Sequence, residues 1–195
     1  MKALKIAKRV FLGLMLTASS ALGLDFGVRQ AANKTIPLPE NYIETAQTIF
    51  GNTVDYSKVR ITFGKVSCLQ PDKAVTIGNT IYYPSSKTPA PDYSFLHEMT
   101  HVWQQQNHIK DTGLPGVIKL WAKYPSYKDS YAFKADSTKA LTDYNLEQQA
   151  SIVANYWIFK GAMDKDPKHP PNAEYETLKK IVGKTLPAPP KPGKP

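Results

Sequence analysis

Apolar side chains recur three or four residues apart in five segments of the chain, a spacing that places them on one face of a helix. These segments are residues 39–50, 94–108, 112–125, 141–157 and 172–182. Pro39 and Asn172 are residue types that commonly start helices, and Gly51 is typical of a helix end. The segments 94–108 and 141–157 are apolar over most of their surface, so we expect both helices to be buried.

Two shorter segments alternate between apolar and polar residues, as strands do. The first is 59–63, and the second is 74–83, where two β-branched runs flank Gly78-Asn79. A two-residue loop with glycine first predicts a β-hairpin with a type II′ turn. We expect residues 81–83 to offer a strand edge to which an extended peptide can add, although plain alternation between core and surface would give the same pattern. The predicted fold class is α+β, with a small sheet packed on the helix 94–108 and on a second downstream helix.

The helix predicted at 94–108 contains the pattern His-Glu-x-x-His at His97, Glu98 and His101. Residues four apart lie on one face of a helix, so the two imidazoles can bind one metal ion. Glu98 can then reach a water at the metal without being a ligand, as in zinc peptidases. Two unrelated surface histidines would give the same pattern. However, the apolar neighbours predict a buried helix, on which polar side chains need partners.

The third ligand must come from another segment. The longer metzincin motif needs a glycine three residues after the second histidine and a third histidine three residues further on, and Gln104 and Asn107 occupy these positions. Asp143 or Asn145 could cap the helix predicted at 141–157, which places Glu147 in its first turn. A glutamate from a downstream helix completes the ligand set of thermolysin-type enzymes. Asp143 is the second candidate. The alternative for Glu147 is an exposed acid that interacts with the helix dipole.

Residues 1–23 have the pattern of a secretory signal peptide, with a basic start, an apolar run and small residues that suit cleavage near residue 21 or 23. The run is shorter than the roughly 20 residues of a membrane span, although an uncleaved anchor is the alternative. We therefore expect a bacterial domain over 25–183, periplasmic or secreted, without a stable membrane span. The proline-rich residues 184–195 predict a disordered tail.

The charge and the cysteine content limit the possible partners and covalent links of the chain. The formal net charge is +9, and four of the basic residues lie in the first nine positions, so the remainder is mildly basic. No run of Lys and Arg is interleaved with aromatic residues, and we therefore expect no nucleic-acid partner. Cys68 is the single cysteine, so no disulfide can form within the chain, and its expected role is that of a small buried apolar residue.

Residues 75–83 followed by 96–105 resemble a bacterial family of zinc metallopeptidases named for the core domain of extracellular contractile injection systems. Members share a T-x-G-N/D-x-I-Y hairpin and an H-E-L-T-H-V-x-Q motif, from which this chain departs at Met99. The segment 144–150 is also similar to proteins related to Vgr or Rhs secretion components. The resemblance implies a zincin-like fold, zinc as cofactor with His97 and His101 as ligands, Glu98 as catalytic base, and a partner from a secretion system.

These features predict an exported, zinc-dependent metallopeptidase that hydrolyses peptides or proteins. His97, His101 and Glu147 would hold Zn²⁺, and Glu98 would carry a proton from the attacking water to the leaving amine. A group is also needed to stabilise the oxyanion, and the tyrosine candidates are Tyr83, Tyr131 and Tyr144. The alternative is a non-catalytic zinc-binding module that serves as a structural or secretion-associated interaction protein.

Overall fold

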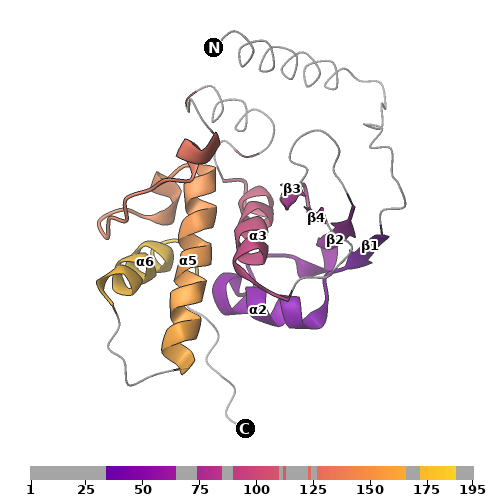
Figure 1. Cartoon of the computed structure of the whole chain (residues 1–195), viewed down its shortest axis with the longest axis horizontal. Coiled ribbons are helices and arrows are strands. Elements are labelled where there is room, and N and C mark those ends of the chain that lie inside the picture. Colours follow the sequence, from indigo (N-terminus) through magenta and orange to yellow (C-terminus); the bar gives the residue numbers. More distant parts are fainter. Residues whose placement is uncertain are drawn as a thin grey trace. The chain divides into compact units, whose positions relative to one another are not determined.

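The computed structural model describes residues 34–64, 74–84, 90–109, 112, 123, 127–165 and 172–187 (Figure 1). All of them belong to one compact unit, Asn33–Pro195. The signal peptide predicted at 1–23, Cys68 and nearly all of the helix predicted at 112–125 lie outside the described residues. None of the described helices has both the length and the apolar character that a membrane span requires.

A four-stranded mixed sheet forms one side of this unit, in the order β1-β2-β4-β3. β1 (Lys34–Pro37) is antiparallel to β2 (Arg60–Phe63), β2 is parallel to β4 (Thr80–Tyr83), and β4 is antiparallel to β3 (Val75–Ile77). The inner strands β2 and β4 contribute the buried residues Ile61, Phe63, Ile81 and Tyr83. β1 is not among the predicted strands. Its four residues are mostly exposed, and its pairing with β2 makes it a strand.

The predicted hairpin is present, but its position in the sheet corrects one expectation. Gly78 has a φ of 61°, and His108 is the one described non-glycine residue with a positive φ. Asn79 therefore has a negative φ, which fits a type II′ turn and excludes type I′. β4 pairs with β2 on one side and with β3 on the other. Among the described strands, residues 81–83 thus have no free edge for a peptide, and the free edge of the hairpin belongs to β3.

Three of the α-helices follow the predicted segments closely. They are α2 (Glu40–Phe50), α3 (Tyr93–Gln106) and α6 (Ala173–Gly183). The side chain of Asp92 accepts a hydrogen bond from the backbone N–H of Phe95, so Asp92 is the N-cap of α3. Asn172 caps α6 in the same way through Tyr175. Short 3₁₀ turns lie at Tyr56–Lys58, Tyr127–Ser130 and Leu141–Asp143.

The helix α5 (Leu146–Lys165) starts and ends later than the predicted segment 141–157. Asn145 and Gln148 form a reciprocal capping box at its start. The Asn145 side chain accepts a hydrogen bond from the Gln148 N–H at 2.9 Å, and the Gln148 side chain accepts one from the Asn145 N–H at 3.2 Å. This cap places Glu147 in the first turn of α5.

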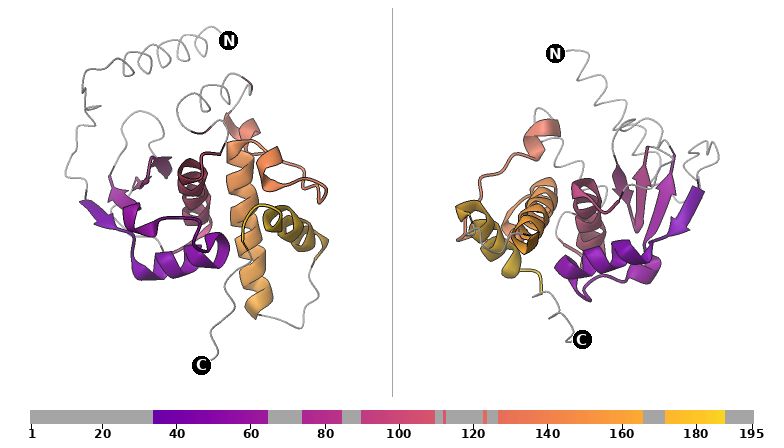
Figure 2. Two further views of the ribbon diagram at one scale, coloured as in Figure 1. Left: turned by 180° about the vertical axis from the view of Figure 1, so that it is seen from behind. Right: turned by 60° about the horizontal axis from the view of Figure 1, so that its bottom comes forward.

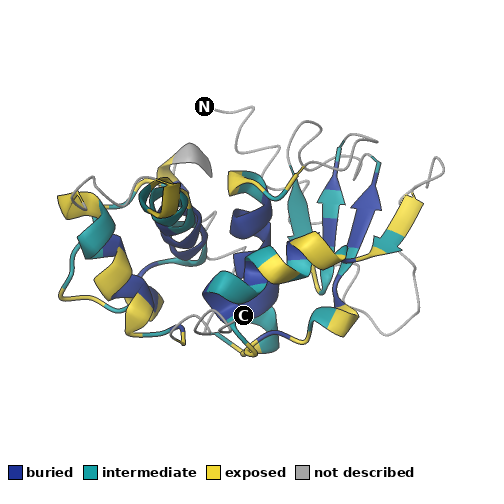
Figure 3. Cartoon of the chain, turned by 90° about the horizontal axis from the view of Figure 1, so that it is seen from below, coloured by how far each residue is buried: buried dark blue, intermediate teal, exposed yellow. Residues whose placement is uncertain are grey.

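The sheet, α3, α5 and α6 follow one another as successive layers (Figure 2). Buried residues line the inner strands and the inward faces of the helices, whereas exposed residues cover the outward faces of α2 and α6 (Figure 3). The fold is therefore α+β, with a small mixed sheet packed against helices. α3 lies between the sheet and α5, so its polar side chains can meet groups from both neighbours.

The folded unit extends beyond residue 183, which corrects the start predicted for the tail. Leu186 is only 4% exposed and belongs to the hydrophobic core. Lys184 donates hydrogen bonds to the backbone carbonyls of Ser137 and Thr138 at 2.7 and 2.8 Å. These contacts make residues 184–187 part of the fold, and the rest of the predicted tail lies outside the described residues.

Candidate metal centre

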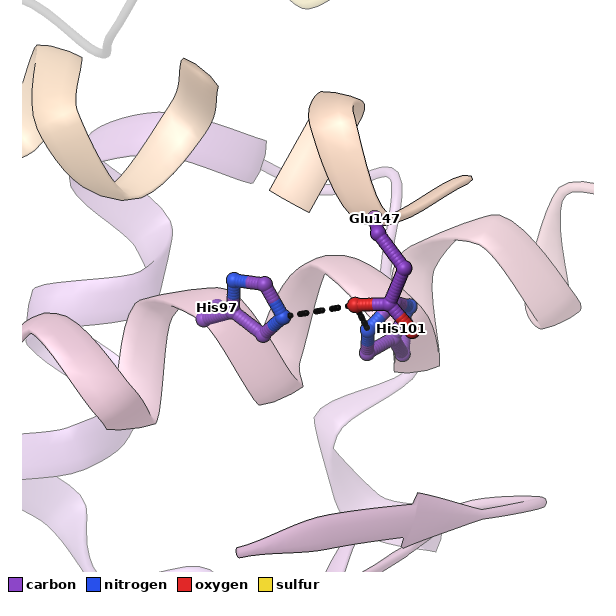
Figure 4. Close-up of side chains that lie close together, drawn as sticks. All are labelled: His97, His101 and Glu147. Atoms are coloured by element: carbon purple, nitrogen blue, oxygen red, sulfur yellow. Dashed lines mark hydrogen bonds and ion pairs between the residues drawn. The ribbon is translucent and has the colours of Figure 1, made fainter. Parts of the chain in front are cut away.

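Three of the predicted site residues converge between α3 and α5 (Figure 4). His97 and His101 lie one turn apart on α3, and Glu147 reaches them from the first turn of α5. Oε2 of Glu147 lies 3.2 Å from Nε2 of His97 and 3.5 Å from Nε2 of His101. One candidate ligand atom from each residue lies within 4.8 Å of the other two. The group therefore offers two imidazoles and one carboxylate to a common point.

The two distances from the Glu147 carboxylate are close to the ligand spacing of a tetrahedral zinc site. Bonds of about 2.0–2.1 Å in tetrahedral geometry separate neighbouring ligand atoms by about 3.3–3.4 Å. The two distances from the Glu147 carboxylate lie within 0.2 Å of that range. Two histidines and a glutamate are also a donor set that zinc accepts. The residues present therefore fit a zinc ion with three protein ligands.

Without a metal, the same side chains form a buried ion pair. Burial alone acts to lower the pKa of His101, but the charge of Glu147 and its hydrogen bond outweigh this effect and raise the pKa to about 9. Burial acts to raise the pKa of Glu147, but His101 and His97 hold it well below its usual range. The metal-free site therefore keeps a proton that a metal ion must displace when it binds.

Glu98 projects from α3 toward the sheet. Its side chain is buried, and the Thr76 hydroxyl of β3 lies 2.7 Å from Oε2 of Glu98 and 3.1 Å from its backbone carbonyl oxygen. Glu98 thus lies beside the two histidines in sequence but faces β3, whereas the histidines face Glu147. This position agrees with the expectation that Glu98 is not a metal ligand.

Tyr131 is the oxyanion candidate that contacts a predicted metal ligand. Its ring stacks on His97 with centroids 5.5 Å apart, and the ring of Tyr93 stacks on His97 at 6.3 Å. The Tyr144 hydroxyl instead accepts a hydrogen bond from the backbone N–H of Asp136. Tyr83 stacks on Phe63 in the sheet, and burial, followed by the charges of Asp92 and Glu98, raises its pKa.

Asp143, the second candidate for the third ligand, is not part of the group. Its side chain is exposed and accepts a hydrogen bond from the backbone N–H of Ala140 at 2.8 Å, within the 3₁₀ turn before α5. Of the two acids proposed from the sequence, Glu147 is the one that the structure places at the histidines.

Sequence reasoning missed three polar residues that contact this site. Thr76 bonds to Glu98, while Gln104 and Gln149 form a buried hydrogen-bonded pair next to His101. A signal was available for Gln104, because a residue three positions after His101 and seven after His97 shares their helix face. For Thr76 and Gln149 the partners belong to other elements, so the sequence carried no comparable signal.

No protein-family model matches the chain. Over 133 residues the sequence is 34% identical to the type VI secretion system spike protein VgrG2b of Pseudomonas aeruginosa, a match that covers 63% of this chain and 13% of the spike protein. The fold matches the effector domain of P. aeruginosa VgrG2b with a TM-score of 0.55 and 27% identity, covering 76% of this chain and 82% of that domain. The chain spans about an eighth of the whole relative, so the similarity is to one domain of it. In sequence the chain is therefore similar to part of this spike protein, and in fold it is similar to the effector domain.

Proposed function

We propose that this protein is an exported, zinc-dependent metallopeptidase with a zincin-like fold. The observation that supports the proposal is the convergence of His97, His101 and Glu147 at distances that suit tetrahedral zinc. Glu98, the expected proton carrier, is buried on the same helix, and its charge acts to raise the pKa of His101. Similarity to an effector domain of a secretion-system spike supports export and a secretion-system partner.

In this proposal different residues bind the metal, transfer the proton and stabilise the oxyanion. Zinc, when bound by His97, His101 and Glu147, supplies the positive charge that polarises the scissile carbonyl and activates water. Glu98 accepts a proton at its carboxylate from the attacking water and passes it to the leaving amine. Tyr131 is the tyrosine best placed to donate a hydrogen bond to the developing oxyanion, because its ring stacks on His97.

The free edge of β3 is the proposed position for the substrate backbone. An extended peptide can add to an unpaired strand edge through main-chain hydrogen bonds. β3 also contributes Thr76, whose hydroxyl bonds to Glu98, so a peptide on this edge would run close to the proton carrier. Ile77 on β3 is 51% exposed and offers an apolar contact there.

A second function is favoured by the comparisons themselves. Similarity to a spike-protein effector domain indicates a secretion-associated protein and does not by itself indicate hydrolysis. On this alternative, zinc only ties α3 to α5, and the protein acts as a non-catalytic interaction module. The two functions share the metal and differ in turnover.

Metal analysis combined with a peptidase assay tests both functions. The purified protein should contain about one zinc per chain, and Glu98→Gln should retain the zinc but lose at least about a hundredfold in hydrolysis of unfolded protein substrates, because the proton carrier is absent. Glu44→Gln, an exposed acid on α2, is the matched control and should retain both properties.

The outcomes separate the hypotheses. Wild-type protein that binds no zinc would refute the metal centre. Zinc binding without hydrolysis of any substrate in a broad panel would favour the interaction module. Equal hydrolysis by wild type and Glu98→Gln would refute the assigned role of Glu98.

A further inference from the structure

Two buried glutamines join α3 to the start of α5 beside the candidate metal centre. Gln104 is 1% exposed and Gln149 is 2% exposed. The side-chain nitrogen of Gln104 donates hydrogen bonds to the backbone carbonyl of Leu146 and to Oε1 of Gln149, both at 3.0 Å. The nitrogen of Gln149 donates to the backbone carbonyl of Tyr144 at 2.7 Å. At the other end, Oε1 of Gln104 lies 2.8 Å from Nδ1 of His101.

The direction of every hydrogen bond in this chain follows from its two backbone ends. A carbonyl oxygen can only accept, so the amide nitrogen of Gln149 must face Tyr144 and its oxygen must face Gln104. The nitrogen of Gln104 then serves both Leu146 and Gln149, which leaves its oxygen toward His101. Rotating either amide by 180° would place oxygen against oxygen, at a buried position where a lost hydrogen bond is costly.

This polarity determines which nitrogen of His101 carries a fixed proton. Oε1 of Gln104 can only accept, so Nδ1 of His101 is the donor. Nε2 is then the nitrogen directed at Glu147 and available to a metal. Metal-binding histidines commonly donate their other ring N–H to an oxygen in this way, which orients the ring.

Gln104 also donates a hydrogen bond to the first turn of α5, the helix that carries Glu147. Leu146 directly precedes Glu147 in the first turn of α5, and its carbonyl is bound by Gln104. One buried side chain on α3 therefore contacts the His101 ring and the backbone next to Glu147. The two candidate ligands come from segments about 45 residues apart, and Gln104 contacts both segments.

We propose that Gln104 and Gln149 are positioning residues that assemble the metal centre before the metal binds. Gln104 orients His101 and the first turn of α5, and Gln149 fixes the orientation of the Gln104 amide. This inference rests on the zinc binding of the proposed function and does not require peptide hydrolysis. It assigns a role to Gln104, three residues after His101, and to Gln149, two residues after Glu147.

The test compares zinc affinities of glutamine-to-methionine variants, because methionine has nearly the same length and cannot make these hydrogen bonds. Zinc dissociation constants are measured by competition with a chromophoric chelator, alongside thermal melting and circular dichroism of the metal-free proteins. Gln104→Met should raise the dissociation constant by about 10- to 100-fold, the range for loss of a hydrogen-bonding partner of a ligand. Gln149→Met should raise it by a smaller factor. Gln105→Met, a half-buried glutamine one residue along α3, should leave it unchanged.

A spectroscopic readout separates positioning from simple stabilisation. In ¹⁵N NMR of the zinc-loaded wild type, His101 should show a protonated Nδ1 with a long-lived proton, and in Gln104→Met that proton should exchange faster with water. If Gln104→Met does not fold, Gln149→Met provides a milder test. It retains the Gln104 side chain but removes one of the two acceptors of its amide nitrogen, so the Nδ1 proton of His101 should exchange faster than in wild type, by a smaller factor.

Three results lead to different conclusions. Folded Gln104→Met or Gln149→Met that binds zinc as tightly as wild type would overturn the positioning role and leave the proposed function intact. Wild type that binds no zinc would overturn both. Wild type that binds zinc without hydrolysing peptides, with weakened binding in the two variants, would support the positioning role while refuting peptidase activity.

Discussion

Replacing Glu147 by glutamine tests the electrostatics of the metal-free site. Glu147→Gln keeps the size of the side chain and removes its negative charge. In the metal-free wild type this charge faces His101 and His97, and the side chains of Glu147 and His101 are 12% and 17% exposed. Solvent therefore screens the pair weakly, and the loss of the charge should be measurable as a change in the free energy of unfolding.

The pKa of His101 sets the size of the effect. His101 has a pKa of about 9 in the folded protein against 6.5 for an unperturbed histidine. At pH 7 this difference corresponds to a stabilisation of about 2–3 kcal/mol by proton linkage. Glu147→Gln should remove it, because burial then favours neutral His101. The loss lies below the roughly 3–5 kcal/mol typical of a broken buried ion pair, since His101 can release its proton.

The effect should depend on pH in a defined direction. The folded pKa of His101 lies above its unfolded value, so its contribution is full below about pH 6.5 and is lost as the pH rises through about 9. The pKa of Glu147 is lowered, so its contribution is present above its ordinary value of 4.5 and is lost as the pH falls. The difference between wild type and variant should therefore be largest between about pH 5 and 6.5.

Urea unfolding of the chelator-treated proteins at pH 5.5, 7 and 9.5 measures this difference. Glu174→Gln is the matched control, because Glu174 is an exposed acid in the first turn of α6. Its loss should cost at most about 1 kcal/mol through the helix dipole. If Glu147→Gln cost no more than this control, or cost the same at pH 5.5 and 9.5, the ion pair would be refuted. Glu147 would then be an ordinary first-turn acid.

Two further predictions concern residues that the sequence did not single out. Thr76→Val should retain zinc and lower kcat by about 10- to 100-fold with little change in KM, because a hydrogen bond to a charged group is worth about 1.5–3 kcal/mol. Thr76→Ser keeps the hydroxyl and should restore most of the rate. An unchanged kcat in Thr76→Val would show that the bond to Glu98 is dispensable. Leu186→Ala should lower the free energy of unfolding by about 2–4 kcal/mol, as expected for a buried leucine. Urea unfolding measures this loss, and a cost below about 0.5 kcal/mol, the range of ordinary surface substitutions, would place residue 186 outside the core.

The parts of the fold that were predictable depend on local signals. The period of apolar residues and the capping residue types located α2, α3 and α6, and the Gly78-Asn79 pair located the hairpin and its turn. β1 was missed because its pairing with β2, far along the chain, makes it a strand. The segment predicted for α5 starts at residue 141, although Asn145 is one of its two candidate caps, and the capping box of Asn145 and Gln148 begins the helix at Leu146.

The site residues also fall into those that could be predicted from local spacing and those that could not. His97, Glu98 and His101 share one helical turn, so their relation could be deduced from spacing alone. Glu147 could be proposed as a candidate because it was an acid on a second buried helix, but its distance from the histidines depends on how α3 packs against α5. The position of β4 inside the sheet could not be foreseen either, since strand order is set by pairing partners and not by the pattern within a strand.

The arrangement of residues around α3 explains how a nearly fully buried helix carries three ionisable groups. At about 100° per residue, His101 and Gln104 lie within about 40° of His97, and Glu98 lies about 100° away. The fully buried apolar residues occupy the opposite arc: Phe95, Leu96, Met99 and Val102. One arc therefore packs in the core, while the other meets α5 through its histidines and β3 through Glu98. Glu98 therefore bonds to Thr76 of β3, whereas the two histidines of the same helical turn face Glu147 of α5.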